Sequence, residues 1–413
     1  MFYLNTEKLK INTPEFSEVV NAYIPSEVYI PIYDDRNYKI GTSIKEGQVI
    51  SQDGNVAIHS SVPGKIEEVR NITLANGKEC KILVVKMQGT FSYVGKKEKK
   101  IDWTSFSSSE ILSKLEENGV YNTFFEFREI KSIIEDVNLE NENILAVRLF
   151  DYDPSCSTDS FLSVNFFDKV LEGAFILGKV INATKIIFFY NKEQKFSLNS
   201  ELNLSENANI ASEFIQVGKK KYSFGTKEEL NTFLKKSNQV ANAFADASMC
   251  LEAYEAVVLG RPVLDKYVQV SGSVLGKEVF FKVKKGTPIK KLIEECDGCK
   301  KHPQKVIVNG VLKGVAISSS STPITSFVKS ITLLSSKEAP TQKQVPCIRC
   351  GDCHRICPVG LRPHILFEEY LYDSKISEEY EATISKCTQC GRCNTVCPSR
   401  LPLFQTISIL SEK

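Results

Sequence analysis

The spacing of apolar and polar positions changes several times along the chain. Within residues 28–88 the pattern is one of short β-prone runs, and Gly, Pro, Asn and Asp separate them. These runs lie at residues 28–32, 47–50, 56–58 and 65–69. The pattern predicts a small sandwich of short strands, which we place in a first domain over residues 1–100.

From about residue 107 helical and strand-like periods alternate, which indicates an α/β sheet in a second domain over residues 101–262. Helices are expected near 109–117, 166–182 and 226–236, and strands near 144–149 and 185–190. The Ala-rich segment 246–259 predicts a buried helix that ends at Gly260, with Pro262 two residues later.

Residues 266–285 predict a strand, a Gly-containing turn and a second strand, and 287–296 a short helix that opens with Thr287-Pro288. This is a small β-grasp-like unit over residues 263–335, and the Ser/Thr-rich segment 318–322 is interpreted as a linker. A cysteine-rich module follows over residues 336–413. The fold class expected is therefore a multidomain α+β protein with an α/β Rossmann-like domain.

Composition narrows the possibilities. A chain of 413 residues is expected to form roughly two to four domains. Its formal net charge of +2 gives no indication of nucleic acid or an acidic membrane surface as a partner. Neither a signal peptide nor a run of about 18 to 20 apolar residues is recognisable, so a cytoplasmic location is expected.

Eight of the 13 cysteines form two runs of the pattern C-x2-C-x2-C-x3-C-P. In such a run three thiolates wrap one [4Fe–4S] cube and the fourth ligates the neighbouring cube. The spacing therefore predicts two clusters. The expected ligands of the first are Cys347, Cys350, Cys353 and Cys397, and those of the second are Cys357, Cys387, Cys390 and Cys393.

Alternatives to this interpretation stay open at this point. A pair of zinc sites would need longer inserts between cysteine pairs than these runs contain. Cys296-x2-Cys299, with His302 nearby, is either an incomplete third metal site or a chance pair. His354 lies inside the first run, where it either tunes a cluster or faces solvent.

The cysteine module resembles that of the RnfC family, whose members belong to the Rnf complex, a membrane-associated ferredoxin:NAD⁺ oxidoreductase. The residues that carry the resemblance are 345–353 and 397–403, and upstream segments follow in the family's order at 30–32, 45–50, 58–66, 255–262 and 268–292. The resemblance implies an N-terminal barrel-sandwich (hammerhead) domain, a soluble-ligand-binding β-grasp (SLBB-like) unit and a C-terminal helical double-cluster ferredoxin-like module. It also implies attachment to the inner face of the cell membrane through other Rnf subunits, and a ferredoxin or flavoprotein redox partner.

Similarity to that family further implies FMN and NADH, with Asp151 and Asp153 as candidate flavin-site residues. The family's Gly-rich loop falls at residues 118–127, where this chain has a single glycine and three phenylalanines. Phosphate binding needs backbone N–H groups that side chains do not block. The departure argues against tight dinucleotide binding.

Two functions of different kinds follow. In one, the chain binds flavin and pyridine nucleotide and exchanges electrons with its clusters. In the other, it is a relay or scaffold that only wires its clusters to a redox partner, including a corrin-reducing or amino-acid-reducing system.

Overall fold

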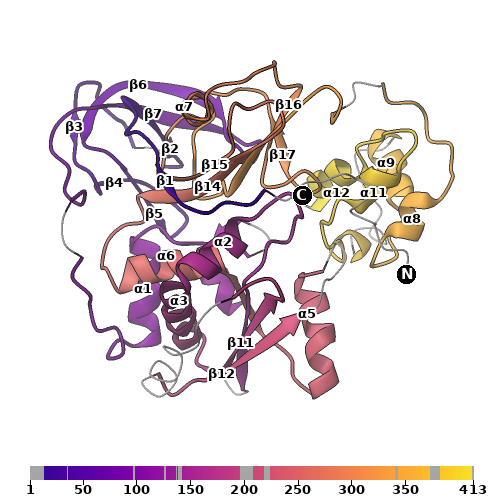
Figure 1. Ribbon diagram of the computed structural model, residues 1–413, viewed down its shortest axis with the longest axis horizontal. Coiled ribbons are helices and arrows are strands. Elements are labelled where there is room, and N and C mark those ends of the chain that lie inside the picture. Colours follow the sequence, from indigo (N-terminus) through magenta and orange to yellow (C-terminus); the bar gives the residue numbers. More distant parts are fainter. Residues whose placement is uncertain are drawn as a thin grey trace.

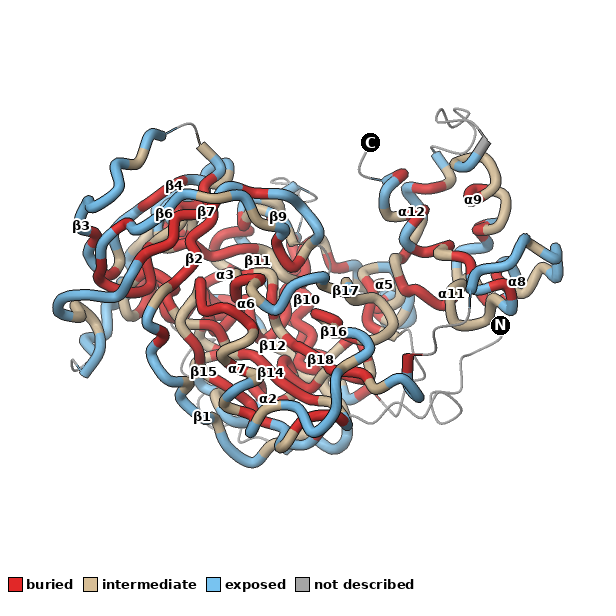
Figure 2. Tube along the Cα trace, turned by 90° about the horizontal axis from the view of Figure 1, so that it is seen from above, coloured by how far each residue is buried: buried red, intermediate tan, exposed pale blue. Residues whose placement is uncertain are grey.

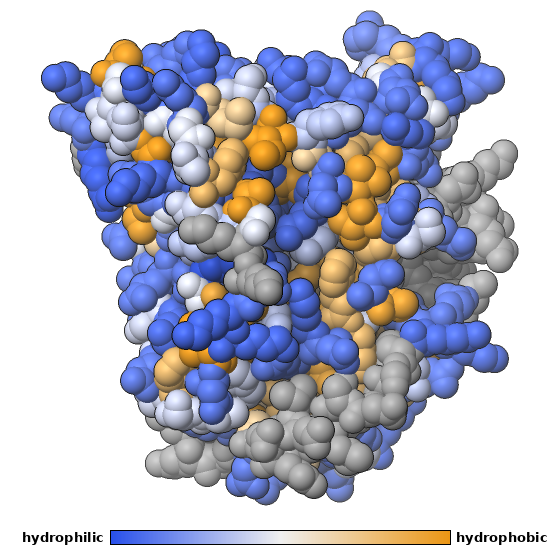
Figure 3. Space-filling view, turned by 60° about the vertical axis from the view of Figure 1, so that its left-hand side comes forward, coloured by the Kyte–Doolittle hydropathy of each residue, from blue (hydrophilic) through white to orange (hydrophobic). Residues whose placement is uncertain are grey.

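The computed structural model describes residues 14–34, 36–95, 98–124, 127–135, 137, 142–195, 208–217, 224–339, 343–372 and 382–411. Sheets and helices form one large body, and a smaller helical part, the C-terminal module, lies at one end of it (Figures 1 and 2). The fold is thus a mixed α/β one with several sheets. Polar side chains cover most of the face seen in Figure 3, and apolar ones gather near its middle.

The first sheet is antiparallel, in the order β2-β7-β6-β3, and a β4–β5 hairpin packs beside it. The strands are β2 (Glu27–Ile32), β3 (Ser43–Ile44), β4 (Val49–Asp53), β5 (Val56–His59), β6 (Gly64–Thr73) and β7 (Glu79–Met87). Alternation along the strands places Val28 and Val85 in one core and Tyr29 and Val84 on the opposite face. The short strands predicted for this region are present.

The second sheet is wholly parallel, in the order β12-β11-β10-β13. Its strands are β10 (Asn143–Arg148), β11 (Ala183–Asn191), β12 (Ala211–Val217) and β13 (Ala243–Asp246). Because β11 and β12 lie on one side of β10 and β13 lies on the other, the strand order reverses between β10 and β13. In open α/β sheets such a reversal forms a crevice outside the carboxyl ends of the strands.

Helices cover both faces of this sheet, as the apolar strands require. On one face, α1 (Ser108–Glu117), α3 (Phe167–Val180) and α6 (Ala247–Val257) share a core with Leu145 and Val147. On the other, α5 (Lys227–Leu234) packs against Ala146 and Ile187. The remaining elements here are α2 (Thr158–Asn165), β8 (Tyr121–Asn122), β9 (Arg128–Glu129) and the short 3₁₀ helices η1 (Ile130–Ile134) and η2 (Lys235–Ser237).

The third sheet is mixed and follows the order β1-β15-β14-β18-β16-β17, with α7 packed against it. Its elements are β1 (Val20–Asn21), β14 (Asp265–Ser271), β15 (Val279–Lys284), α7 (Ile289–Glu295), β16 (Lys305–Val308), β17 (Val315–Ile317) and β18 (Ser330–Leu334).

Three expectations for the third sheet need correction. Residues 318–322, interpreted as a linker, connect two strands of this one sheet. Thr287 does not cap α7, because its hydroxyl donates to the Lys284 carbonyl. β1, from the N-terminal segment, pairs with β15, and local sequence carries no signal for so distant a partner.

The C-terminal module contains α8 (Asp352–Ile356), α9 (Pro363–Tyr372), α11 (Arg392–Val396) and α12 (Leu403–Ser411). α8 packs with α11 and α9 with α12. Gly391, at the start of α11, lies so close to the body that a Cβ there would be 2.1 Å from the Leu312 carbonyl oxygen. The second cysteine run therefore faces the body.

Candidate functional site

The eight motif cysteines line two cavities in the C-terminal module. The first cavity is bordered by Cys347, Cys350, Cys353 and Cys397, and the second by Cys357, Cys387, Cys390 and Cys393. The fourth cysteine of each run thus lies at the cavity of the other run. Four thiols spaced around a cavity are the arrangement that a four-iron cube requires. Among the residues described, no three His, Cys, Asp or Glu side chains converge enough to hold a single metal ion.

Both cysteine loops have the same backbone geometry. Arg349 and Gln389 adopt left-handed conformations with φ of 56° and 45°, and each is followed two residues later by a glycine that begins a helix. This turn aims the amides of Arg349 and Gln389 at the Cys347 and Cys387 sulfurs, each at 3.4 Å. N–H groups directed at cluster sulfurs are one of the means by which proteins set reduction potentials.

The histidine nearest the first cavity is one that the sequence did not single out. His364 Nδ1 lies 3.5 Å from the Cys353 sulfur, and its ring borders the cavity. His354 is exposed, with Nδ1 2.9 Å from the Leu361 carbonyl oxygen. No spacing rule connects His364 to the motif, because the start of α9 is what brings it back to Cys353.

The two cavities differ in their surroundings. Cys390 is buried together with Tyr152 of the body, and Leu312 packs against the pair. Cys350, in the first run, is exposed. The second cavity is therefore the inner one, and the first faces away from the body.

A second candidate site, which we call the sheet-edge pocket, lies where the strand order reverses. Arg148 ends β10, and the loop after it contributes Asp151, Tyr152 and Asp153. Asp159 of α2 and Lys329, next to β18, also border the pocket. In doubly wound sheets this is where nucleotides bind, with a phosphate at a helix N-terminus.

The two aspartates predicted for a flavin site both hold backbone amides. Asp151 accepts hydrogen bonds from the amides of Asp159 and Ser160, in the first turn of α2, at 2.9 Å each. Asp153 accepts from the amides of Leu312 and Lys313 at 2.8 and 3.2 Å, and so fixes the loop that contacts the C-terminal module. Burial, and then the neighbouring Asp159, raise the pKa of Asp151 to about 6.

The N-terminus of α6 is satisfied in the same way. Asp246 accepts from the amide of Met249 at 2.9 Å, and Asp159 accepts from the amide of Ser248 at 3.0 Å. Lys329 Nζ lies 2.6 Å from the Asp246 carboxylate and 3.1 Å from that of Asp159. Burial favours a higher pKa for Asp246, but Lys329 and Arg148 hold it below its usual value.

The segment in the position of the Gly-rich loop is partly described, since Phe125 and Glu126 lie outside the described residues. The ring of Phe124 is buried under the Arg148 guanidinium, 4.5 Å from its centroid. The guanidinium donates to three backbone carbonyls, those of Phe124, Phe150 and Gly225. Its donors are therefore directed at the protein itself.

These contacts test whether a flavin or pyridine nucleotide fits. Amides in the first turns of α2 and α6, which would have to meet a phosphate, already donate to the chain's own carboxylates. A phosphate would also lie beside Asp151, Asp153, Asp159 and Asp246. The described residues of the sheet-edge pocket do not fit FMN or NADH phosphate.

The pair Cys296 and Cys299 does not present two ligands to one site. Cys296 is buried in the core around α7, whereas Cys299 is exposed. His302 is exposed as well.

Comparison with known proteins agrees with the cluster geometry. Residues 343–401 match the family described as a 4Fe-4S dicluster domain. This match supports [4Fe–4S] clusters in the C-terminal module.

Similarity to characterised proteins extends over most of the chain. It is 23% identical over 87% of its length to the RnfC-type subunit of the proton-translocating ferredoxin:NAD(+) oxidoreductase complex of Clostridium ljungdahlii, covering 82% of that protein. It is 22% and 23% identical to the corresponding subunits of the ion-translocating oxidoreductase complexes of Haemophilus influenzae and Pasteurella multocida. The chain spans 45% and 48% of those two relatives. The resemblance to RnfC is confirmed.

A solved NAD⁺-reducing [NiFe]-hydrogenase chain overlaps 67% of this chain and 55% of its own length, at 12% identity and a TM-score of 0.49. That likeness is too low to support a statement on function. Among the helices described, none has the length and apolar character needed to cross a bilayer.

Proposed function

We propose that this chain, similar to the RnfC-type subunits of ion-translocating oxidoreductases, is an electron-transfer subunit of an Rnf-type membrane-associated complex. The observation that carries the proposal is the crossed arrangement of the eight cysteines around two cavities. In this proposal the first cluster is held by Cys347, Cys350, Cys353 and Cys397, and the second by Cys357, Cys387, Cys390 and Cys393. Such clusters accept and release single electrons.

The chain acts as a relay in this proposal and has no nucleotide of its own. Support comes from the sheet-edge pocket, where carboxylates of the chain already receive the helix amides. The second candidate function is that of a subunit that exchanges electrons with FMN and NADH. The name of the Clostridium ljungdahlii relative, which includes NAD(+), favours that alternative.

Electrons enter or leave through the first cluster, which faces away from the body. Exposed basic residues gather along the sequence around its ligands, and the exposed apolar side chain of Ile348 lies among them. These basic residues are Lys343, Arg349, Arg355, Arg362 and Arg400. Such a rim complements an acidic electron carrier of the ferredoxin type, because opposite charges steer docking.

Other subunits of the complex hold the chain at the inner, cytoplasmic face of the membrane in this proposal. The domain assignments are part of it too: a barrel-sandwich domain for the first sheet, a Rossmann-like domain for the parallel sheet, an SLBB-like β-grasp unit for the third and a ferredoxin-like C-terminal module.

Metal analysis of anaerobically isolated protein tests the cluster assignment. Each cube holds four irons, so the chain should contain about eight iron and eight labile sulfide. Cys350→Ala should remove the first cluster and lower the iron content toward about four. Cys299→Ser, at an exposed cysteine outside the motifs, is the matched control and should leave both values unchanged. Stoichiometric zinc without iron would overturn the proposal.

A further inference from the structure

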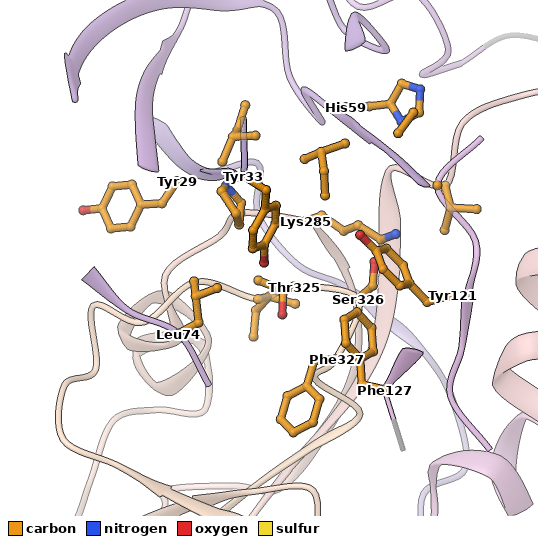
Figure 4. A pocket seen from close by; sticks show the side chains of 18 of the residues that line it. Tyr29, Tyr33, His59, Leu74, Tyr121, Phe127, Lys285, Thr325, Ser326 and Phe327 are labelled. Atoms are coloured by element: carbon orange, nitrogen blue, oxygen red, sulfur yellow. The ribbon is translucent and has the colours of Figure 1, made fainter. Parts of the chain in front are cut away.

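A second pocket, which we call the aromatic pocket, lies where the first sheet, the loop before β8 and the third sheet meet. Figure 4 shows its labelled side chains converging from β2, β5, β8, the β9 region and the segment before β18. Aromatic rings form much of its lining: Tyr29, Tyr33, Tyr121, Phe127 and Phe327.

Two of these rings form a wall shared with the sheet-edge pocket. Phe127 and Phe327 border both pockets and pack edge to face, with ring centroids 5.8 Å apart. Phe127 also stacks on Tyr121, with centroids 4.4 Å apart. Flat, preorganised ring surfaces of this kind suit a planar aromatic ligand.

Lys285 projects into the same pocket, and its ammonium group has no partner there. Within the part of the chain that the structure describes, no ion pair and no side-chain hydrogen bond joins Lys285 Nζ to another residue. Two neighbouring lysines that are also shielded from water do have partners, since Lys266 pairs with Glu252 and Lys284 with Glu46. An unpaired ammonium group in an enclosed site is available to an anion.

Hydroxyl groups add to this donor set. The Ser326 and Thr325 side chains point toward the centre of the pocket in Figure 4, close to Lys285 and Tyr33. His59, also at the pocket, is neutral near pH 7 because burial, and then the charge of Lys285, lower its pKa to about 4. The only cationic side chain of the described lining at that pH is therefore Lys285.

We propose that the aromatic pocket binds a small planar aromatic molecule that carries one anionic group. Its ring lies against Phe127, Phe327 and Tyr121, and its anionic group meets Lys285, with Ser326 and Thr325 as further donors. This site is separate from both cluster cavities, and it stands whether or not the chain serves an Rnf-type complex.

Two dyes that share one aromatic body separate the ring contacts from the charge contact. 8-Anilinonaphthalene-1-sulfonate carries a sulfonate, and N-phenyl-1-naphthylamine lacks it. We expect the sulfonate dye to bind the holoprotein with one-to-one stoichiometry, measured by fluorescence titration. Lys285→Met should weaken its binding at least about tenfold, since a charge-assisted hydrogen bond is lost. It should leave binding of the neutral dye unchanged.

Two further variants complete the design. Phe327→Ala removes a wall and should weaken both dyes, whereas Lys301→Met, at an exposed lysine outside the lining, should affect neither. Iron content and circular dichroism of each variant confirm that the fold is kept. If Lys285→Met binds the sulfonate dye as the unaltered protein does, or if the dye binds only at several weak sites, the proposal is wrong.

A pH titration gives an independent readout. Burial lowers the pKa of Lys285 to about 8, so affinity for the sulfonate dye should fall as the pH rises through that value and the lysine loses its charge. The neutral dye should show no such change. The groups that face Lys285 are His59, Tyr121, Glu252, Glu255, Asp265 and Lys266. An affinity for the sulfonate dye that is flat through this range would contradict the role of Lys285.

Discussion

At the scale of single residues, Lys329 decides how the sheet edge is used. Its ammonium group lies between the buried carboxylates of Asp159 and Asp246, and each carboxylate in turn accepts an amide from the first turn of α6. The chain thus supplies both the anions and the cation at a position where a nucleotide phosphate would otherwise be the anion.

Replacing Lys329 with Met should be strongly destabilising, because two carboxylates would stay buried without a counter-charge. We expect a loss of about 3–5 kcal/mol in the free energy of unfolding. Urea unfolding followed by circular dichroism measures it. Lys291→Met, which removes an exposed pair with Glu294, should cost about 1 kcal/mol or less.

The pH dependence has a definite sign. The pKa of Asp246 is lowered in the folded protein, so its stabilising contribution is present above the unfolded value of about 3.9 and is lost as the pH falls through the folded one. The penalty of Lys329→Met should therefore be largest at neutral pH and shrink on acidification, where the carboxylates become protonated. A penalty independent of pH would contradict the charge-pair explanation.

At the scale of elements, the two cysteine runs form equivalent loops in different surroundings. Both Gly351 and Gly391 precede a short helix, with φ of 75° and 66°. A Cβ on Gly391 would meet the Leu312 carbonyl oxygen at 2.1 Å, whereas the nearest atom to one on Gly351 is at 3.9 Å. Substitutions at the two glycines therefore isolate the contact between the module and the body.

Gly391→Ala should loosen the C-terminal module from the loop at residues 311–313. Each alanine costs about 1 kcal/mol for the left-handed backbone, so only the steric contact differs between Gly391→Ala and Gly351→Ala. We expect faster hydrogen exchange of the Leu312 and Lys313 amides in Gly391→Ala, measured by mass spectrometry. Equal exchange in both variants would show that the contact does not hold the module.

At the scale of the whole molecule, the arrangement is a body with an inner cluster against it and an outer cluster facing away, in the proposed function. Tyr152 links the two parts, since it borders the sheet-edge pocket and packs with Cys390. The path between a docked carrier and the body therefore passes through the outer cluster first.

NADH should not bleach the cluster absorbance of the isolated chain, because the sheet-edge pocket lacks free amide donors for its phosphates. Losing one such donor set costs a few kcal/mol, on the order of a hundredfold in affinity. Dithionite or reduced ferredoxin should bleach it, since both cysteine motifs are complete. Rapid stoichiometric reduction by NADH, or FMN bound to the purified chain, would restore the flavin-dependent alternative.

Features that depend on short-range spacing could be predicted from the amino-acid order. The two cysteine runs predicted which four thiols meet at each cavity, because a tight loop with two-residue spacers has few ways to present its sulfurs. Strand and helix periods located β2, β10, β11, α1, α3 and α6, since burial of one face imposes its period on the residues.

Features that depend on residues far apart in the chain emerged only from the folded structure. No local pattern shows that Lys329 reaches Asp159 and Asp246, that β1 joins the third sheet, or that His364 turns back to Cys353. The same holds for Lys285, an ordinary lysine at the end of a strand until three segments enclose it with aromatic rings. Packing between distant segments sets burial and charge pairing, and a linear pattern carries only the part of that information that repeats along one element.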